Sequence, residues 1–218
     1  MRHINTLVFD FDGTLANCPY DFAYMRRSIL ATAREHGLDP VLLNGFGLLE
    51  SIEEGTRLLG HVPETASAFQ QIAMERLSAI EFEAAAATYL LPGVVEALEA
   101  LRAAGFRLGV VTRNSTAAVQ RIIGDIVLPV DAFLPREAVT LPKPHPAHAE
   151  AMLRLLDRTP AQALMVGDHP MDIEMGKAAG MGTVAVLTGQ SSEATLRAAA
   201  PDLLLPSVIE LAGMLLEK

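Results

Sequence analysis

Five short apolar runs, bounded by polar residues, glycine or proline, constrain the fold of this chain more than any other feature of its sequence. The runs are Asn5–Asp10, Phe106–Thr112, Ala163–Gly167, Thr183–Leu187 and Asp202–Leu205. They are almost continuously apolar rather than alternating, which is typical of strands that are covered on both faces. We therefore predict that they form a buried parallel sheet.

Helical segments alternate with these runs from about residue 92 onward. Val94–Ala104 and Met171–Ala179 are followed by Gly105 and Gly180, where a left-handed residue is expected to end a helix. Two further segments extend the alternation, Pro146–Asp157 and Ser207–Leu216. The pattern predicts the α/β class, with a Rossmann-like doubly wound parallel sheet core and right-handed crossovers.

One interval is too long for this pattern. A crossover between parallel strands needs about 30 residues, yet about 95 lie between Asp10 and Phe106. Apolar residues recur there at helical spacing, before Gly37 and again after Pro63: Phe22, Met25, Ile29 and Ala33, then Phe69, Ile72, Leu77 and Ile80. We predict an inserted helical cap domain over residues 16–90, with residues 1–15 and 91–218 forming the α/β core domain.

Composition narrows the function. The chain has 218 residues, half of them hydrophobic, and a net charge of −9 without a basic stripe, so nucleic acid is not an expected partner. No apolar run approaches the 18 or so residues of a membrane span, and we expect no membrane association. Cys18 is the only cysteine, which suits a reducing cytoplasm. Periodicity leaves open whether the protein is a monomer or a homodimer.

Polar residues follow three of the predicted strands. Asp10 and Asp12 come at the end of the first, Thr112 at the end of the second and Asp168 directly after Ala163–Gly167. Ligands of open α/β sheets bind at the carboxyl ends of the strands. Carboxylates gathered there are the oxygen ligands that Mg²⁺ prefers when it also binds a phosphate.

Each of these residues also has a structural explanation. An isolated D-x-D-G, as at Asp10, is as compatible with a turn as with a site. Thr112 could be a helix N-cap, and a single lysine such as Lys143 is most often solvated. Asp168 and Asp172 could cap or precede the helix that starts near Met171. Their occurrence together and in order favours a site.

Four motifs resemble those of the haloacid dehalogenase (HAD) superfamily. They are VFDFDGTL at 8–15, VVTRNS at 110–115, the pair Lys143-Pro144, and VGDHPMDIEMGKAAG at 166–180. The first and last are specific, whereas the middle two would be weak alone. The helical insertion between the first two motifs is similar to the cap of the subgroup that contains phosphoglycolate phosphatase and β-phosphoglucomutase.

The resemblance implies a Mg²⁺-dependent phosphatase that acts on a small phosphorylated metabolite, phosphoglycolate-like or a sugar phosphate, through an aspartyl-phosphate intermediate. Asp10 would be the nucleophile and Asp12 the general acid and base. Thr112 and Lys143 would bind and neutralise the phosphoryl group. Asp168, one oxygen of Asp10 and the backbone carbonyl of Asp12 would hold Mg²⁺, with Asp172 orienting metal-bound water.

Some positions depart from the family pattern. Ala16, Asn17 and Cys18 stand where many relatives have x-Asp-Ser, which leaves the hinge of the cap and its substrate contacts undefined. Arg113 and His169 occupy positions that vary in the family, and Arg113 is a candidate substrate ligand. Arg57 is a second candidate, although an exposed arginine without a ligand is the commoner structure.

Three other functions are compatible with parts of the pattern. A phosphomutase of the β-phosphoglucomutase type would use both Asp10 and Asp12 but would shield the phospho-enzyme from water. A haloacid dehalogenase needs neither Mg²⁺ nor an acid for its leaving group, so Asp12 and Asp168 argue against it. A non-catalytic phosphate-binding module is disfavoured because the complete set of polar residues is present.

Overall fold

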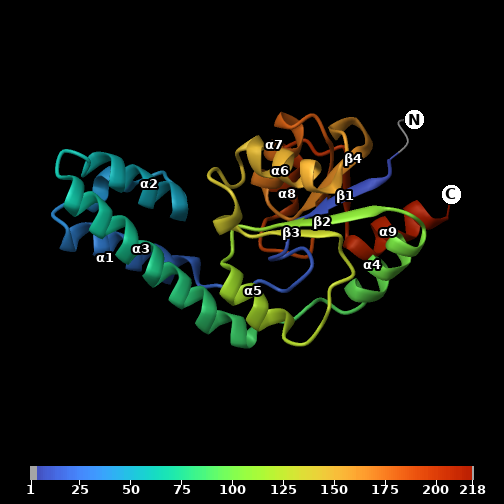
Figure 1. Ribbon diagram of the computed structural model, residues 1–218, viewed down its shortest axis with the longest axis horizontal. Coiled ribbons are helices and arrows are strands. Elements are labelled where there is room, and N and C mark those ends of the chain that lie inside the picture. The colour runs from blue at the N-terminus through green and yellow to red at the C-terminus, as the bar shows by residue number, and fades with distance from the viewer. Residues whose placement is uncertain (1–3, 218) are drawn as a thin grey trace. The chain divides into compact units, whose positions relative to one another are not determined.

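The computed structural model describes residues 4–217, which form two compact units (Figure 1). Pro19–Ala86 forms the helical unit, and the rest of the described chain forms the core unit. Within the described residues, no helix combines the length and the apolar character that crossing a bilayer requires.

The core unit is built on a six-stranded parallel sheet with the order β3-β2-β1-β4-β5-β6. The strands are β1 (Thr6–Phe9), β2 (Arg107–Val111), β3 (Ala132–Leu134), β4 (Ala163–Gly167), β5 (Gly182–Val186) and β6 (Leu203–Leu205). All five predicted strands are present. The short edge strand β3 was not predicted, because it has three residues, two of them half-buried, and little apolar sequence around it.

Helices cover both faces of this sheet. They are α4 (Val94–Ala103), α5 (Thr116–Ile123), α6 (Pro146–Leu156), α7 (Pro170–Ala178), α8 (Glu193–Ala198) and α9 (Val208–Leu216). Single turns of 3-10 helix occur in the core unit at η3 (Arg136–Ala138) and η4 (Pro160–Gln162), and η2 (Ala85–Ala87) lies where the chain passes from the helical unit to the core unit. Helices α6 and α7 lie on one side of the sheet and α4 and α9 on the other (Figure 1). This arrangement confirms the predicted α/β fold class.

The central strand β1 explains why the chain folds around its N-terminal segment. Leu7, Val8 and Phe9 are fully buried. Phe9 lies in register with Val110 of β2 on one side and Val166 of β4 on the other. Three neighbouring parallel strands therefore end at the same edge of the sheet, and the residues that follow them meet there.

The helical unit contains α1 (Phe22–Glu35), η1 (Pro40–Leu43), α2 (Leu48–Leu58) and α3 (Pro63–Ala84). Asp21 caps α1 by accepting a hydrogen bond from the Tyr24 amide, and Pro63 occupies the first turn of α3. Met25, Ile29, Phe69 and Leu77 form its buried interior. Phe22 was predicted on the same apolar face, but it lies at the first residue of α1 and is 45% exposed.

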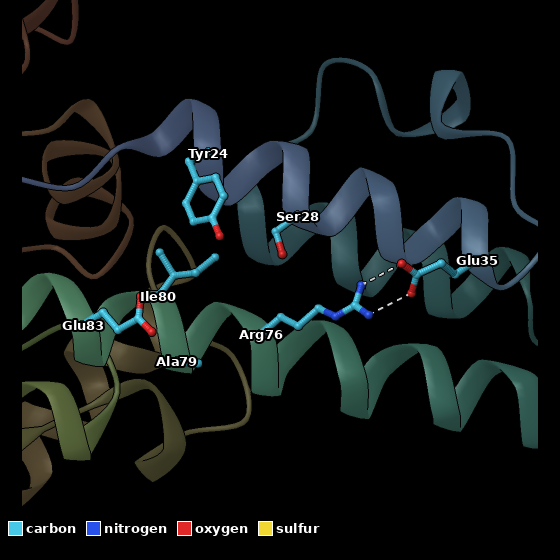
Figure 2. Close-up of a pocket in the computed structure, with 7 residues that line it drawn as sticks. All are labelled: Tyr24, Ser28, Glu35, Arg76, Ala79, Ile80 and Glu83. Atoms are coloured by element: carbon cyan, nitrogen blue, oxygen red, sulfur yellow. Dashed lines mark hydrogen bonds and ion pairs between the residues drawn. The ribbon is translucent and has the colours of Figure 1, made fainter.

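A shallow groove of about 400 Å³ runs between α1 and α3 within the helical unit (Figure 2). Figure 2 shows that the guanidinium of Arg76 spans the groove and is paired with the carboxylate of Glu35. Arg76 also donates a hydrogen bond to the Thr32 hydroxyl at 2.8 Å. These contacts join α1 to α3, so Arg76 has a structural role in the groove.

The close approach of α6 to β2 generates a prediction about stability. A Cβ added at Gly109 would overlap the thioether of Met152, which is fully buried. We expect Gly109→Ala to lower the free energy of unfolding by roughly 1–3 kcal/mol, because neighbouring side chains would have to shift in a packed core. Urea unfolding followed by circular dichroism measures this change.

Gly213→Ala is the matched control. Gly213 is exposed on α9 with nothing near its missing Cβ, and alanine is the better helix former by about 1 kcal/mol. The control variant should be at least as stable as the wild type. Equal stability of the two variants would contradict the packing of α6 on β2.

Candidate active site

The candidate site lies at the carboxyl edge of the sheet, where β1, β2 and β4 end. Asp10 directly follows β1, Thr112 follows β2 and Asp168 follows β4. The Asp10 amide donates to the carbonyl of Val166 at 2.8 Å, which continues the ladder one residue past the strand. The sheet thus brings together three side chains that are up to 158 positions apart, from Asp10 to Asp168.

Three buried carboxylates form the centre of the site. Asp10, Asp168 and Asp172 each place an oxygen within 4.8 Å of the others. The Thr14 hydroxyl donates to Asp168 at 3.2 Å. A Cβ at Gly13 or at Gly189 would overlap the Asp168 carboxylate, so two glycines leave room for this group.

Lys143 neutralises part of this charge. Its ammonium contacts Asp10 directly and donates to Asp172 at 2.9 Å, and the side chain is 5% exposed. Burial by itself would lower the pKa of Lys143, but the carboxylates of Asp10 and Asp172 outweigh burial and hold it above its usual value. Lys143 is therefore a cation in the site.

The pKa values of two carboxyl groups are also raised, which for an acid favours the uncharged form. Burial raises the pKa of Asp10 well above its usual value; the Lys143 ammonium opposes this shift and the neighbouring carboxylates add to it. Burial, together with the charge of Asp172, raises the pKa of Asp168 to about 7. Three acidic groups with one ammonium leave an excess of negative charge in a buried place.

This donor set fits a hard divalent cation. The ligands available are carboxylate oxygens, which Mg²⁺ and Ca²⁺ prefer, and the lack of a Cβ at Gly13 and Gly189 leaves room for the Asp168 carboxylate. A cation would also offset the repulsion that raises the pKa of Asp10 and Asp168. Asp10, Asp168 and Asp172 are accordingly the candidate metal residues.

Asp172 has a structural role as well. It is the third residue of α7, and its Oδ2 accepts a hydrogen bond from the His169 amide at 3.1 Å, which forms a capping box. Its Oδ1 accepts from Lys143. Helix capping and the candidate site were alternatives in the sequence, and in the structure one carboxylate takes part in both.

The side chain of Asp12 faces a different set of partners. Its Oδ2 accepts a hydrogen bond from the Thr112 hydroxyl at 2.9 Å, and its Oδ1 accepts one from the side-chain NH₂ group of Asn114 at 3.0 Å. Asn114 is buried and was not singled out in the sequence, because an asparagine inside VVTRNS gives no signal that its side chain points at residue 12.

Two arginines, Arg113 and Arg136, make contacts at the loop that follows β2. Arg136 is 5% exposed and donates to the backbone carbonyl of Arg113 at 2.8 Å. Arg113, a predicted substrate ligand, points its guanidinium at the sulfur of Met171 at 2.7 Å. His169, left open in the sequence, accepts from the Met171 amide at 3.2 Å, and burial lowers its pKa.

Arg57, the other predicted substrate ligand, lies on α2 in the helical unit. Its guanidinium makes two 2.7 Å hydrogen bonds to Glu54 on the same helix, and its side chain is 67% exposed. The contact is the one expected of a surface arginine at i, i+3.

Sequence reasoning also missed His148. It is fully buried, its Nδ1 accepts from the backbone amide of Lys143 at 3.2 Å, and its Nε2 lies 3.1 Å from the carbonyl of Leu134. Accepting at Nδ1 requires that Nε2 carry the proton, so this imidazole is neutral. The same Leu134 carbonyl accepts from the Thr112 amide at 3.1 Å. His148 therefore links the backbone of Lys143 to the end of β2.

Comparisons with known proteins find one family and several relatives that this chain resembles. The sequence profile of the family described as haloacid dehalogenase-like hydrolase matches residues 4–180. Pyrophosphatase PpaX of Bacillus mycoides is 28% identical over 236 residues, which cover 97% of each protein. Phosphoglycolate phosphatase of Rhodospirillum rubrum is 30% identical over 195 residues, covering 86% of this chain and 81% of the relative.

Solved structures share the fold. A hydrolase from Pseudomonas syringae superposes with a TM-score of 0.73 at 19% identity and covers 98% of both chains. At this level of identity the likeness bears on the fold, and it agrees with the predicted class.

The buried imidazole of His148 generates a prediction about pH. Burial lowers its pKa from 6.5 to about 4. Because the unfolded chain binds this proton more tightly, the stability that the neutral ring contributes is complete above pH 6.5 and is lost as the pH falls toward 4. Between pH 7 and 4.5 the wild type should lose roughly 2–3 kcal/mol more free energy of unfolding than His148→Asn.

Urea titrations at the two pH values measure the difference. His61→Asn is the control, because His61 is exposed in the helical unit and its removal should leave the wild-type pH dependence in place. A His148→Asn variant that loses as much stability as the wild type would show that this ring is not held neutral.

Proposed function

The chain belongs to the haloacid dehalogenase-like hydrolase family, and we propose that it is a Mg²⁺-dependent phosphatase of small phosphate monoesters with Asp10 as its nucleophile. Family membership agrees with the resemblance drawn from the four motifs. One observation carries the proposal: the Asp10 carboxylate lies at the end of the central strand, in contact with the Lys143 ammonium and beside Asp168.

Asp10 is suited to attack phosphorus. An Asp10 oxygen would form a bond to phosphorus while the bond to the leaving alcohol breaks, and water would then hydrolyse the acyl phosphate. The Lys143 ammonium would offset charge on the nucleophile and on the phosphoryl oxygens. The Thr112 hydroxyl, which donates to Asp12 in this structure, would donate to a phosphoryl oxygen instead once a substrate is present.

Asp12 would move the protons. It would give a proton to the leaving oxygen in the first step and take one from the attacking water in the second. The two acids at the end of β1 would have different roles. The buried Asp10, beside an ammonium, would be the nucleophile, and the half-buried Asp12 would be the general acid and base.

Asp168 and Asp10, with the backbone carbonyl of Asp12, would hold Mg²⁺, and Asp172 would orient its water. When bound, the cation would neutralise charge that develops on the phosphoryl group. The grouping of the Asp10, Asp168 and Asp172 carboxylates supports this assignment.

A small phosphorylated metabolite is the proposed substrate. The names of two relatives, a phosphoglycolate phosphatase and a pyrophosphatase, support a phosphoryl compound. Arg113 is the candidate ligand for the rest of the substrate in the core unit, and Arg57 is the candidate in the helical unit. We propose that the helical unit, predicted over residues 16–90, serves as the cap.

Hydrolysis of p-nitrophenyl phosphate tests the reaction. Wild-type protein with Mg²⁺ should release phosphate steadily, and EDTA should abolish the release. Asp10→Asn should lower kcat by at least about 10³-fold, because an amide cannot serve as the nucleophile. Asp125→Asn, at an exposed aspartate after α5, is the matched control and should be fully active.

Full activity of Asp10→Asn, or turnover that does not need a metal, would refute the mechanism. A phosphomutase would instead interconvert sugar phosphate isomers with little release of inorganic phosphate, so the same phosphate assay separates the two reactions.

Affinity for Mg²⁺ should depend on pH. Because Asp168 has a pKa of about 7 without a cation, it must lose a proton before it can bind one. The Kd for Mg²⁺ should therefore fall roughly tenfold between pH 6 and pH 8. Calorimetric titration of EDTA-stripped protein measures it, and Asp168→Asn should bind weakly at both values. An unchanged Kd in the wild type would contradict the assignment of Asp168.

A further inference from the structure

We propose that Asn114 is a positioning residue for the acid-base group Asp12, an inference that rests on the proposed phosphatase function. Asn114 lies three residues beyond the end of β2, is 4% exposed and reaches back to a carboxylate 102 positions earlier in the chain. Together with Thr112 it holds both oxygens of Asp12.

The orientation of the Asn114 amide follows from its neighbours. Its Oδ1 accepts a hydrogen bond from the backbone amide of Ser115 at 2.8 Å. A backbone N–H can only donate, so this end of the side chain is the oxygen and the other end is the NH₂ group. The NH₂ group lies 3.0 Å from Oδ1 of Asp12 and is therefore its donor.

The direction of the Thr112 contact follows in the same way. The Thr112 hydroxyl oxygen accepts from the backbone amide of Asn114 at 3.0 Å, which leaves its own hydrogen to be donated. It donates to Oδ2 of Asp12 at 2.9 Å. The Thr112 hydroxyl has one hydrogen, so it can serve either Asp12 or a phosphoryl oxygen. With a substrate bound, Asn114 can keep its hydrogen bond to Oδ1 of Asp12, and the carboxylate cannot rotate about its last bond without breaking that bond.

The loop that carries these donors is itself anchored. Ser115 caps α5 by accepting from the Ala118 amide at 3.3 Å. The carbonyl of Asn114 accepts from the Arg136 amide at 3.4 Å, and the Arg136 guanidinium donates to the carbonyl of Arg113. Asn114 therefore acts from a fixed backbone, as a positioning group must.

This placement matters most in the first chemical step. The bond from phosphorus to the leaving oxygen breaks as the bond from Asp10 to phosphorus forms, and the proton of Asp12 moves to the leaving oxygen. In the second step water attacks phosphorus, its proton moves to Asp12, and the carboxylate of Asp10 is released. If Asp12 is turned away from the leaving oxygen, the first step becomes slower only for a substrate whose leaving oxygen needs a proton.

Two substrates of similar shape separate a positioning role from a general loss of structure. The leaving group of phenyl phosphate is a phenol with a pKa of about 10, like that of tyrosine, and it needs the proton. The leaving group of p-nitrophenyl phosphate is a much stronger acid and leaves as an anion. The ratio kcat/KM reports on steps up to release of the phenol, so the later role of Asp12 as a base does not enter it.

The test compares kcat/KM of the Mg²⁺-loaded protein on both substrates. Asn114→Ala should lose roughly 10- to 100-fold on phenyl phosphate and less than about 3-fold on p-nitrophenyl phosphate. Asn114→Asp keeps the size of the side chain and the acceptor for Ser115 but replaces the donor by a second carboxylate, so its selective loss should be larger. This variant gives the answer even if the alanine variant does not fold.

Ser115→Ala is the matched control, because it removes a cap from the same loop without touching Asp12. Any loss in this variant should be equal on the two substrates. Equal losses on both substrates in Asn114→Ala and Asn114→Asp would overturn the positioning role. Failure of the proposed function looks different: Asp10→Asn would then be as active as the wild type.

Discussion

The site depends on one buried ammonium among three buried carboxylates. Burial raises the pKa of Asp10 and Asp168, and repulsion from the neighbouring carboxylates adds to the shift. Lys143 offsets part of this charge by contacting two of the three carboxylates. The arrangement is stable only if the backbone holds the charged groups in place. The excess of negative charge favours a bound cation, and such a cation together with Lys143 would attract an anionic phosphoryl group.

The backbone meets this requirement by having three parallel strands end together. The register of β1 with β2 and β4 places Asp10, Thr112 and Asp168 at one edge. Buried polar side chains then orient the loops that follow. His148 holds the backbone of Lys143, Asn114 and Thr112 hold the carboxylate of Asp12, and these contacts replace the water that the buried groups have lost.

The parts of the site that could be predicted are those with a local signature. Asp10 and Asp168 follow apolar strands directly, Asp12 comes two residues after Asp10, and strand ends converge in any parallel sheet, so these residues could be singled out from the sequence. Asn114 and His148 could not be found in this way. The partner of Asn114 is 102 positions away in the sequence, and the Nε2 of His148 contacts the backbone carbonyl of Leu134 in β3. Neither contact produces a periodic pattern in the sequence. The short edge strand β3 was not predicted for a related reason, since a strand of three residues, two of them half-buried, carries too little apolar sequence.

The sequence by itself determined the α/β class, the helical insertion and the order of the acidic motifs, because hydrophobic periodicity and strand-end residues are local properties of the chain. Only the tertiary structure decided which donor each carboxylate oxygen accepts a hydrogen bond from. It showed that Asp172 both caps α7 and binds Lys143, and that Asp12 is held by Thr112 and Asn114. Those choices depend on distances between segments far apart in the chain, and such distances are set when the sheet assembles.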